Sequence, residues 1–107
     1  MSELEEIFKG IGDRLTQNPE KIKGMTASFQ FDLAGEGGGL YHVEIKDGTP
    51  SVGTGALENP GVTISMSAAD FQEMVAGRLN STAAFMSGRL KLKGDMGLAM
   101  KLQSILL

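Results

Sequence analysis

The sequence predicts an α+β fold in which helices cover one face of a five-stranded, mostly antiparallel sheet. Two observations carry this prediction. Apolar residues recur at every second position in short runs between residues 27 and 66, which is the period of a half-buried strand. They recur at helical spacing at both ends of the chain. A sheet with one apolar face needs a second layer, and the helical segments can supply it.

The first helix is predicted over residues 2–17, where Ser2 and Glu5 have the form of a capping box. Its apolar residues share one face at helical spacing: Leu4, Ile7, Phe8, Ile11 and Leu15. Asn18 and Pro19 end the pattern, because a proline removes a backbone donor and breaks the helix.

Four strands follow, and each is separated from the next by a loop that contains glycine. They are predicted at residues 27–33, 41–46, 51–57 and 62–66. The third carries Gly53 and Gly55, so we expect a weak strand at an edge of the sheet. The apolar face of the sheet is predicted to comprise Phe29, Phe31, Leu33, Val62, Ile64 and Met66.

Two helices and a fifth strand are predicted between residues 67 and 93. Ser67 should cap a helix that presents Phe71, Met74, Val75 and Leu79 on one face and runs to about residue 79, with Gly77 and Asn80 loosening its end. A short helix at residues 81–86 presents Phe85 and Met86. Residues 89–93 then form a strand with Leu90 and Leu92 inward and three cations outward.

The final helix, residues 95–107, is capped by Asp95 and has more apolar residues than one face can hold. One face is predicted to be Leu98, Leu102, Ile105 and Leu106, while Met96, Ala99, Met100 and Leu107 point elsewhere. A helix that is apolar nearly all round is either fully buried or covers something apolar. Three explanations stay open: a seam between two copies, a lid over a lipid cavity, or a buried core helix.

Length and charge limit the classes of partner. The 107 residues fit one domain, residues 1–107, and the net charge of −3 argues against nucleic acid. Five basic and twelve acidic residues give the first 77 positions −7, whereas five basic residues against Asp95 give the last 30 positions +4. A basic, apolar end of the chain suits weak contact with an anionic membrane surface through Arg89, Lys91, Lys93 and Lys101.

The chain has no cysteine, no apolar N-terminal run and no apolar stretch near 18 residues, so we expect a soluble cytoplasmic protein. Its one histidine, His42, lies on the polar side of its strand, and the serines have no base beside them. We therefore expect no catalytic residues, no metal site, no cofactor and no enzyme activity.

Three blocks of sequence resemble the sterol carrier protein 2 family, whose domain is the SCP2 sterol-binding domain. They are F-D-L-A-G at Phe31 to Gly35, S-A-A-D-F at Ser67 to Phe71, and A-F-M-S-G-R-L-K-L-K-G-D-M-G-L-A-M-K-L from Ala84 to Leu102. The resemblance covers the whole chain. It implies a five-stranded sheet covered on one face by helices and enclosing an apolar tunnel for sterols, fatty acids, fatty acyl-CoA or phospholipids. By position, the tunnel lining is expected to include Phe71, Met74, Val75, Phe85, Met86, Leu98, Leu102, Ile105 and Leu106.

This resemblance implies a non-catalytic intracellular lipid carrier. The chain has no peroxisomal ending and resembles stand-alone bacterial or archaeal members of the family, so a long apolar ligand is expected, namely a fatty acid, fatty acyl-CoA, phospholipid or sterol-like molecule, with a sterol the least expected of these. The alternative is a protein-interaction or accessory module that docks through its apolar C-terminal helix, on a partner or on its own copy. A monomer and a dimer are both compatible with the sequence.

Overall fold

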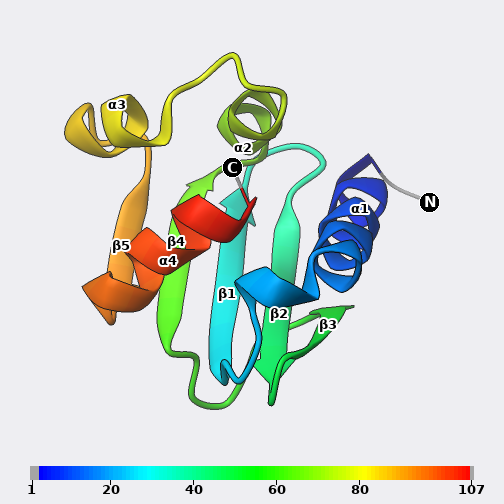
Figure 1. Cartoon of the computed structure of the whole chain (residues 1–107). Coiled ribbons are helices and arrows are strands. Elements are labelled where there is room, and N and C mark those ends of the chain that lie inside the picture. The colour runs from blue at the N-terminus through cyan, green and yellow to red at the C-terminus, as the bar shows by residue number, and fades with distance from the viewer. Residues whose placement is uncertain (1–2, 107) are drawn as a thin grey trace.

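The computed structural model describes the backbone of residues 3–106 and the side chains of residues 3–102. Its elements follow the predicted order of a helix, four strands, two helices, a strand and a closing helix (Figure 1). They are α1 (Glu3–Gln17), the 3-10 helix η1 (Pro19–Lys21), β1 (Ala27–Ala34), β2 (Gly39–Lys46), β3 (Thr49–Thr54), β4 (Val62–Ser67), α2 (Ala68–Val75), α3 (Ser81–Met86), β5 (Lys91–Gly94) and α4 (Met96–Leu106). None of these helices, within the described residues, is both long enough and apolar enough to cross a membrane.

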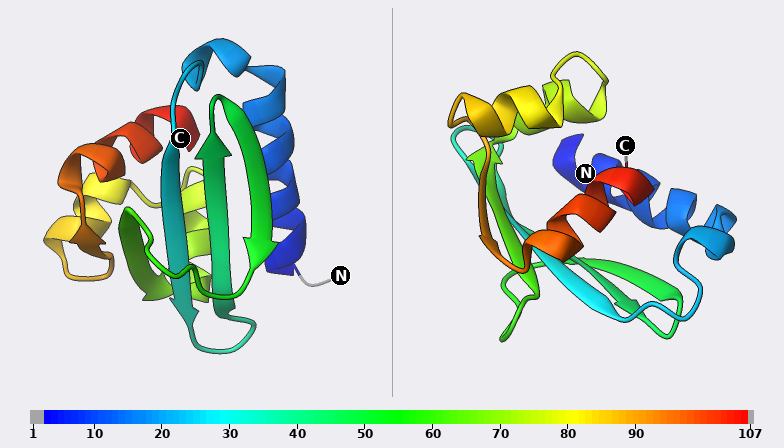
Figure 2. Two further views of the ribbon diagram at one scale, coloured as in Figure 1. Left: turned by 90° about the horizontal axis from the view of Figure 1, so that it is seen from below. Right: turned by 60° about the vertical axis from the view of Figure 1, so that its left-hand side comes forward.

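The five strands form one mixed sheet with the order β3-β2-β1-β4-β5. Strands β1 and β4 are parallel, and the other neighbouring pairs are antiparallel, which confirms the predicted sheet. The described helices gather on one side of the sheet (Figure 2). The α+β class and the two-layer arrangement predicted from the sequence are therefore confirmed.

The core lies between the inner face of the sheet and the helices. The predicted apolar face is buried, and alternate residues of β1 and β4 are more exposed. Helix α1 adds Phe8, whose ring stacks on Tyr41 with 4.6 Å between centroids and on Phe71 with 5.3 Å. Phe31 meets Phe8 edge-on at 5.1 Å. These aromatic contacts join α1, the sheet and α2, and such pairs stabilise a core beyond their burial alone.

Side-chain caps place the starts of two helices where the sequence predicts them. The Ser67 hydroxyl accepts a hydrogen bond of 3.0 Å from the backbone N–H of Asp70 at the start of α2. Asp95 Oδ1 accepts bonds from the N–H groups of Gly97 at 2.8 Å and Leu98 at 3.3 Å, at the start of α4. Each bond satisfies a donor that the first helical turn leaves unpaired.

Helix α2 ends at Val75, four residues before the predicted end. Gly77 adopts a positive φ of 83°, and the N–H groups of Gly77 and Arg78 turn back to the carbonyls of Met74 at 3.1 Å and Glu73 at 2.9 Å. This pattern closes a helix, and glycine adopts it without steric cost. The predicted extent was therefore wrong, because the apolar spacing continues through Leu79 after the backbone has turned.

Strand β3 is an edge strand, as predicted, but it ends at Thr54 rather than at residue 57. Gly55 takes a φ of 97°, and the N–H of Leu57 donates to the side chain of Gln30 at 2.8 Å. The chain thus leaves the ladder after Thr54.

Candidate functional site

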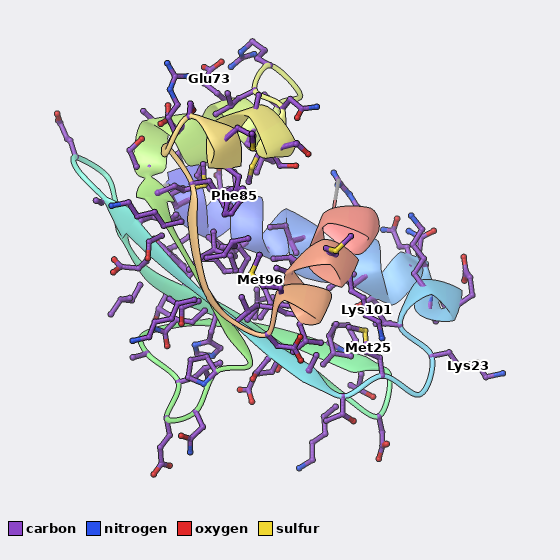
Figure 3. The ribbon with its side chains drawn as sticks, turned by 90° about the vertical axis from the view of Figure 1, so that its left-hand side faces the viewer. Lys23, Met25, Glu73, Phe85, Met96 and Lys101 are labelled. Carbon is purple, nitrogen blue, oxygen red and sulfur yellow. The ribbon has the colours of Figure 1, made fainter. Side chains whose placement is uncertain are left out.

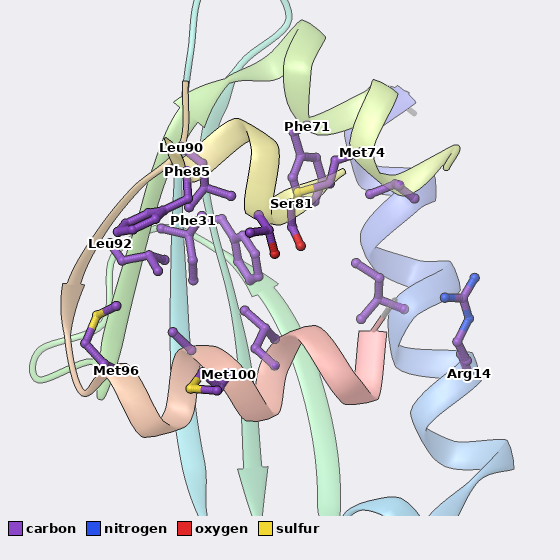
Figure 4. A pocket seen from close by; sticks show the side chains of 16 residues that line it. Arg14, Phe31, Phe71, Met74, Ser81, Phe85, Leu90, Leu92, Met96 and Met100 are labelled. Carbon is purple, nitrogen blue, oxygen red and sulfur yellow. The ribbon is translucent and has the colours of Figure 1, made fainter. Parts of the chain in front are cut away.

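A cavity of about 260 Å³ lies between the inner face of the sheet and the helices (Figure 4). It is lined from α1, β1, β4, α2, α3, β5 and α4, together with the turns beside them. The lining residues are Ile11, Arg14, Phe31, Ile64, Phe71, Met74, Val75, Ser81, Thr82, Phe85, Leu90, Leu92, Met96, Ala99, Met100 and Leu102.

The floor of the cavity is apolar and packed. Phe31 and Ile64 stand opposite each other on the parallel strands β1 and β4, and both are buried. Phe31 meets Phe71 of α2 edge-on with 5.6 Å between ring centroids. Leu92 of β5 pairs opposite Ile64, so the inner face extends to the edge of the sheet. Packed aromatic and aliphatic side chains of this kind hold the shape of a cavity in place.

Helix α4 forms one wall, and its first turn is attached to Gly61. The N–H of Asp95 donates to the carbonyl of Gly61 at 2.9 Å. The Leu98 side chain packs over Gly61, where a Cβ would lie 2.6 Å from Leu98 Cδ1. Leu98 therefore faces the turn before β4, and Met96, Ala99, Met100 and Leu102 face the cavity.

The structure brings five of the residues expected to bind ligand to the cavity: Phe71, Met74, Val75, Phe85 and Leu102. It does not bring Met86 or Leu98 there, since Met86 is 79% exposed on α3 and Leu98 packs against the core. The side chains of Ile105 and Leu106 lie outside the described residues. Contact with a ligand stays a prediction for every one of these residues.

Several lining residues were not among the expected site residues. Ile11, Phe31, Ile64, Leu90 and Leu92 had a signal in the sequence, because each was predicted on an inward apolar face. Met96, Ala99 and Met100 were predicted to point away from the main face of the last helix. Ser81 and Thr82 had no such signal, and neither did Arg14, which belongs to the polar side of α1.

Charge is confined to one end of the cavity. Among the described lining residues Arg14 alone is ionisable, and Ser81 and Thr82 add hydroxyl groups. Figure 4 shows Arg14 on α1 and Met96 on α4 at opposite sides of the cavity. The site therefore has an apolar interior with a positive charge at one end, an arrangement that fits an amphipathic molecule with an anionic end.

The mouth of the cavity has an apolar rim. Phe85, Met96 and Met100 line the cavity and are also 44%, 48% and 72% exposed. Figure 3 shows Phe85 below α3 and Met96 beside α4, on the two sides of the gap between these helices. Met86 lies next to Phe85 in the chain and is the most exposed of the described large apolar side chains. The exposed apolar side chains of the lining therefore lie on α3 and α4.

The other charged side chains of residues 3–102 are not part of the cavity lining. Lys91 and Lys93 pair opposite Ser65 and Thr63, so they lie on the other face of β5 from Leu92. Arg78 Nε donates to Glu73 at 2.6 Å, and this hydrogen bond lowers the pKa of the exposed Glu73 carboxyl. Residues 3–102 contain no cluster of three or more His, Cys, Asp or Glu residues that could hold a metal ion.

The relatives that match this chain are longer proteins. The chain is 43% identical over 106 residues to hydroxysteroid dehydrogenase-like protein 2 of Xenopus tropicalis, a match that covers 98% of the chain and 25% of the relative. It is 38% identical over 104 residues to the Homo sapiens protein of the same name, covering 96% of the chain and 24% of that relative. The chain thus spans about a quarter of the length of these relatives.

Solved structures share the fold and much of the length. The palmitated SCP2L2 protein of Aedes aegypti superposes with a TM-score of 0.80 at 26% identity, covering 99% of this chain and 95% of that one. Sterol carrier protein 2 from Yarrowia lipolytica, solved in an apo form, gives 0.72 at 29% identity, covering 94% and 86%. The sequence matches the SCP-2 sterol transfer family over residues 7–107. The chain therefore belongs to the SCP-2 sterol transfer family, as the three sequence blocks predict.

Proposed function

We propose that this protein is a non-catalytic lipid carrier that shields a long acyl chain from water in the cavity between the sheet and helices α2, α3 and α4. The observation that carries the proposal is the apolar cavity of about 260 Å³ within an SCP2 fold. This volume is close to the range of about 300 to 1,000 Å³ typical of ligand sites. Burial of an acyl chain there would contribute about 25 cal/mol per Å² of apolar surface.

The proposed ligand is an acyl chain with an anionic end, such as a fatty acid or a fatty acyl-CoA. Arg14 stands at one end of the cavity and can donate charge-assisted hydrogen bonds to a carboxylate or phosphate. The chain would then extend over Phe31 and Ile64 toward Leu92 and Met96. Palmitate is a suitable probe, and the solved relative from Aedes aegypti is described as palmitated.

The test is a palmitate titration of the delipidated full chain by calorimetry, compared with a variant whose cavity is partly filled. Ala99→Leu extends a buried lining residue of α4 into the cavity and should weaken palmitate binding about ten-fold. Ala83→Leu is the matched control, because Ala83 is exposed on α3 and does not line the cavity. Circular dichroism checks that both variants fold. Equal palmitate affinity in the wild type and a folded Ala99→Leu variant would exclude this cavity as the binding site.

A carrier has to collect and release its ligand at a lipid surface, and the mouth fits such contact. Phe85, Met86, Met96 and Met100 give α3 and α4 an exposed apolar rim. Basic residues just before β5, on β5 and on α4 add attraction to anionic lipids, and salt would screen it. They are Arg89, Lys91, Lys93 and Lys101. The cytoplasmic location expected from the sequence stays a prediction.

A second function is favoured by the lengths of the relatives. In proteins named hydroxysteroid dehydrogenase-like protein 2, a region similar to this chain makes up about a quarter of the length. In this alternative the domain is an accessory module of an oxidoreductase. Its cavity holds the lipid, and the apolar rim on α3 and α4 docks on the oxidoreductase. Gel filtration of the chain mixed with a dehydrogenase from the same cell tests this alternative. A stable complex that Met86→Glu disrupts would support it, and separate elution would count against it.

A further inference from the structure

Among the described residues, the exposed methionines are all on the two helices that flank the cavity mouth. Met96 and Met100 on α4 are 48% and 72% exposed, and both line the cavity. Met86 on α3 is 79% exposed but lies outside the lining. Met66 and Met74, by contrast, are only 5% and 8% exposed. A solvent-borne reagent thus reaches methionine sulfur at the mouth long before it reaches methionine in the core.

Methionine sulfur is a soft nucleophile that reacts with peroxides. A sulfur lone pair attacks one oxygen of hydrogen peroxide and the O–O bond breaks. The sulfoxide forms as the other oxygen leaves and, with a proton transferred, becomes water. The thioether loses two electrons, and the peroxide that gains them is the only oxidant required. The product is a polar side chain in place of an apolar one, and sulfoxide reductases can reverse the change.

We propose that Met96 and Met100 are oxidation sites at which peroxide converts the mouth of the cavity from apolar to polar and thereby weakens lipid binding. This inference rests on the proposed function, because it requires that the cavity binds lipid. A bound acyl chain would cover the side chains of Met96 and Met100. When these are oxidised, binding would therefore remove water from each sulfoxide oxygen. The described lining near them is apolar and includes Phe85, Leu92 and Ala99. A polar group that loses water without a new partner is destabilising.

The positions of the other methionines make the inference specific. Met74 lines the cavity but is buried, so peroxide should reach it late. Met86 should be oxidised early, yet its sulfoxide can stay hydrated because the side chain lies outside the lining. Oxidation at Met86 should therefore leave lipid affinity unchanged. Leucine is a close apolar replacement for methionine and cannot be oxidised in this way.

The experiment treats the full chain with millimolar hydrogen peroxide, locates each added oxygen by peptide mass spectrometry and titrates palmitate before and after treatment. The wild type and Met86→Leu should gain oxygen at Met96 and Met100 ahead of Met66 and Met74. Their palmitate affinity should fall about five-fold or more. The double variant Met96→Leu with Met100→Leu should bind palmitate equally before and after treatment. Incubation with methionine sulfoxide reductase should restore the affinity of the treated wild type.

Two results would overturn the assignment of Met96 and Met100 as oxidation sites that control lipid binding, and would leave the proposed lipid-carrier function intact. One is unchanged palmitate affinity in wild type that carries sulfoxides at both positions. The other is an equal loss of affinity in the double variant, which would place the sensitive group elsewhere. If the untreated wild type fails to bind palmitate at all, the proposed function fails together with this inference, so the two failures are distinguishable.

Discussion

Leu98 of α4 packs directly over Gly61, the residue that precedes β4, and leaves no room for a Cβ there. The same glycine accepts a hydrogen bond from the N–H of Asp95 at 2.9 Å and donates its own N–H to the carbonyl of Ser28 at 3.0 Å. Gly61 therefore joins the sheet to the first turn of α4. The helix that forms one wall of the cavity depends for its position on a residue that does not line the cavity.

Gly61→Ala should destabilise the fold by about 1 to 3 kcal/mol, because the new methyl group overlaps Leu98 Cδ1, which must move, and lies only 3.1 Å from the backbone carbonyl oxygen of Ser28. Urea denaturation measures the loss. Adding Leu98→Ala should recover part of it, so the double variant should be less destabilised than the sum of the two single variants. Gly10→Ala is the control: a Cβ there meets nothing within 4 Å in the middle of α1, and it should stabilise by about 0.5 to 1 kcal/mol. If the loss of stability in the double variant equals the sum of the losses in the two single variants, Leu98 and Gly61 do not interact as described.

Arg14→Gln should weaken palmitate binding about three- to ten-fold and leave hexadecanol binding unchanged. The guanidinium can interact with the carboxylate of palmitate, whereas the neutral alcohol provides no charge for it. Arg78→Gln is a matched control, since Arg78 pairs with Glu73 outside the cavity. Calorimetric titration with both ligands provides the comparison. Equal losses for acid and alcohol would mean that Arg14 contributes packing rather than head-group recognition.

Charge reversal on β5 should reduce binding to anionic vesicles. Lys91→Glu with Lys93→Glu replaces two exposed cations on the face of β5 opposite Leu92, and vesicles with one-third phosphatidylserine should then sediment less protein. Lys46→Glu, on an exposed position of β2, controls for net charge. Binding of the wild type should also fall as salt rises. If the wild type binds purely neutral vesicles to the same extent as anionic vesicles, these cations do not attract lipid and only protect the edge of the sheet.

Palmitate should stabilise the folded protein and slow amide hydrogen exchange most in α4. A ligand at about 100 times its dissociation constant adds about 2.7 kcal/mol if it binds only the folded state. Helix α4 packs against the cavity with Ala99 and Leu102, whereas β1 and β2 are already held in the centre of the sheet. Exchange at residues 96–102 should therefore slow more than exchange at residues 29–33. Equal slowing in both segments would indicate global stabilisation without a local effect on α4.

The local parts of the fold could be predicted because they depend on short-range physics. Alternation at Phe29 and Phe31 identifies a strand and its buried face, and Ser67 and Asp95 mark helix starts through bonds to neighbouring N–H groups. Inward placement of Leu90 and Leu92 follows from the same alternation. The sequence blocks then place these elements in one known architecture.

The cavity could be predicted only in part, because its shape depends on how distant elements pack. Apolar spacing on the last helix pointed to Leu98, but the contact with Gly61 turns that side chain toward the sheet and leaves Met96 and Met100 at the mouth. Arg14 lies on the polar side of an amphipathic helix, where the sequence indicates solvent. Arg14 is indeed exposed, and it also lines one end of the cavity because α1 packs against α4, which lies at the other end of the chain. The sequence pattern of α1 or of α4 alone does not predict that these two helices are in contact.

The methyl groups of methionine allow the most direct test of lipid binding in this cavity. Delipidated protein with ¹³C-labelled methionine methyl groups is titrated with palmitate, and nuclear Overhauser effects between the acyl chain and each methyl group are recorded. Binding in the cavity predicts effects at Met74, Met96 and Met100, which line it, and none at Met25, Met66 and Met86, which do not. Effects confined to Met25, Met66 or Met86, or saturable binding without effects at Met74, would contradict a lipid site between the sheet and helices α2, α3 and α4.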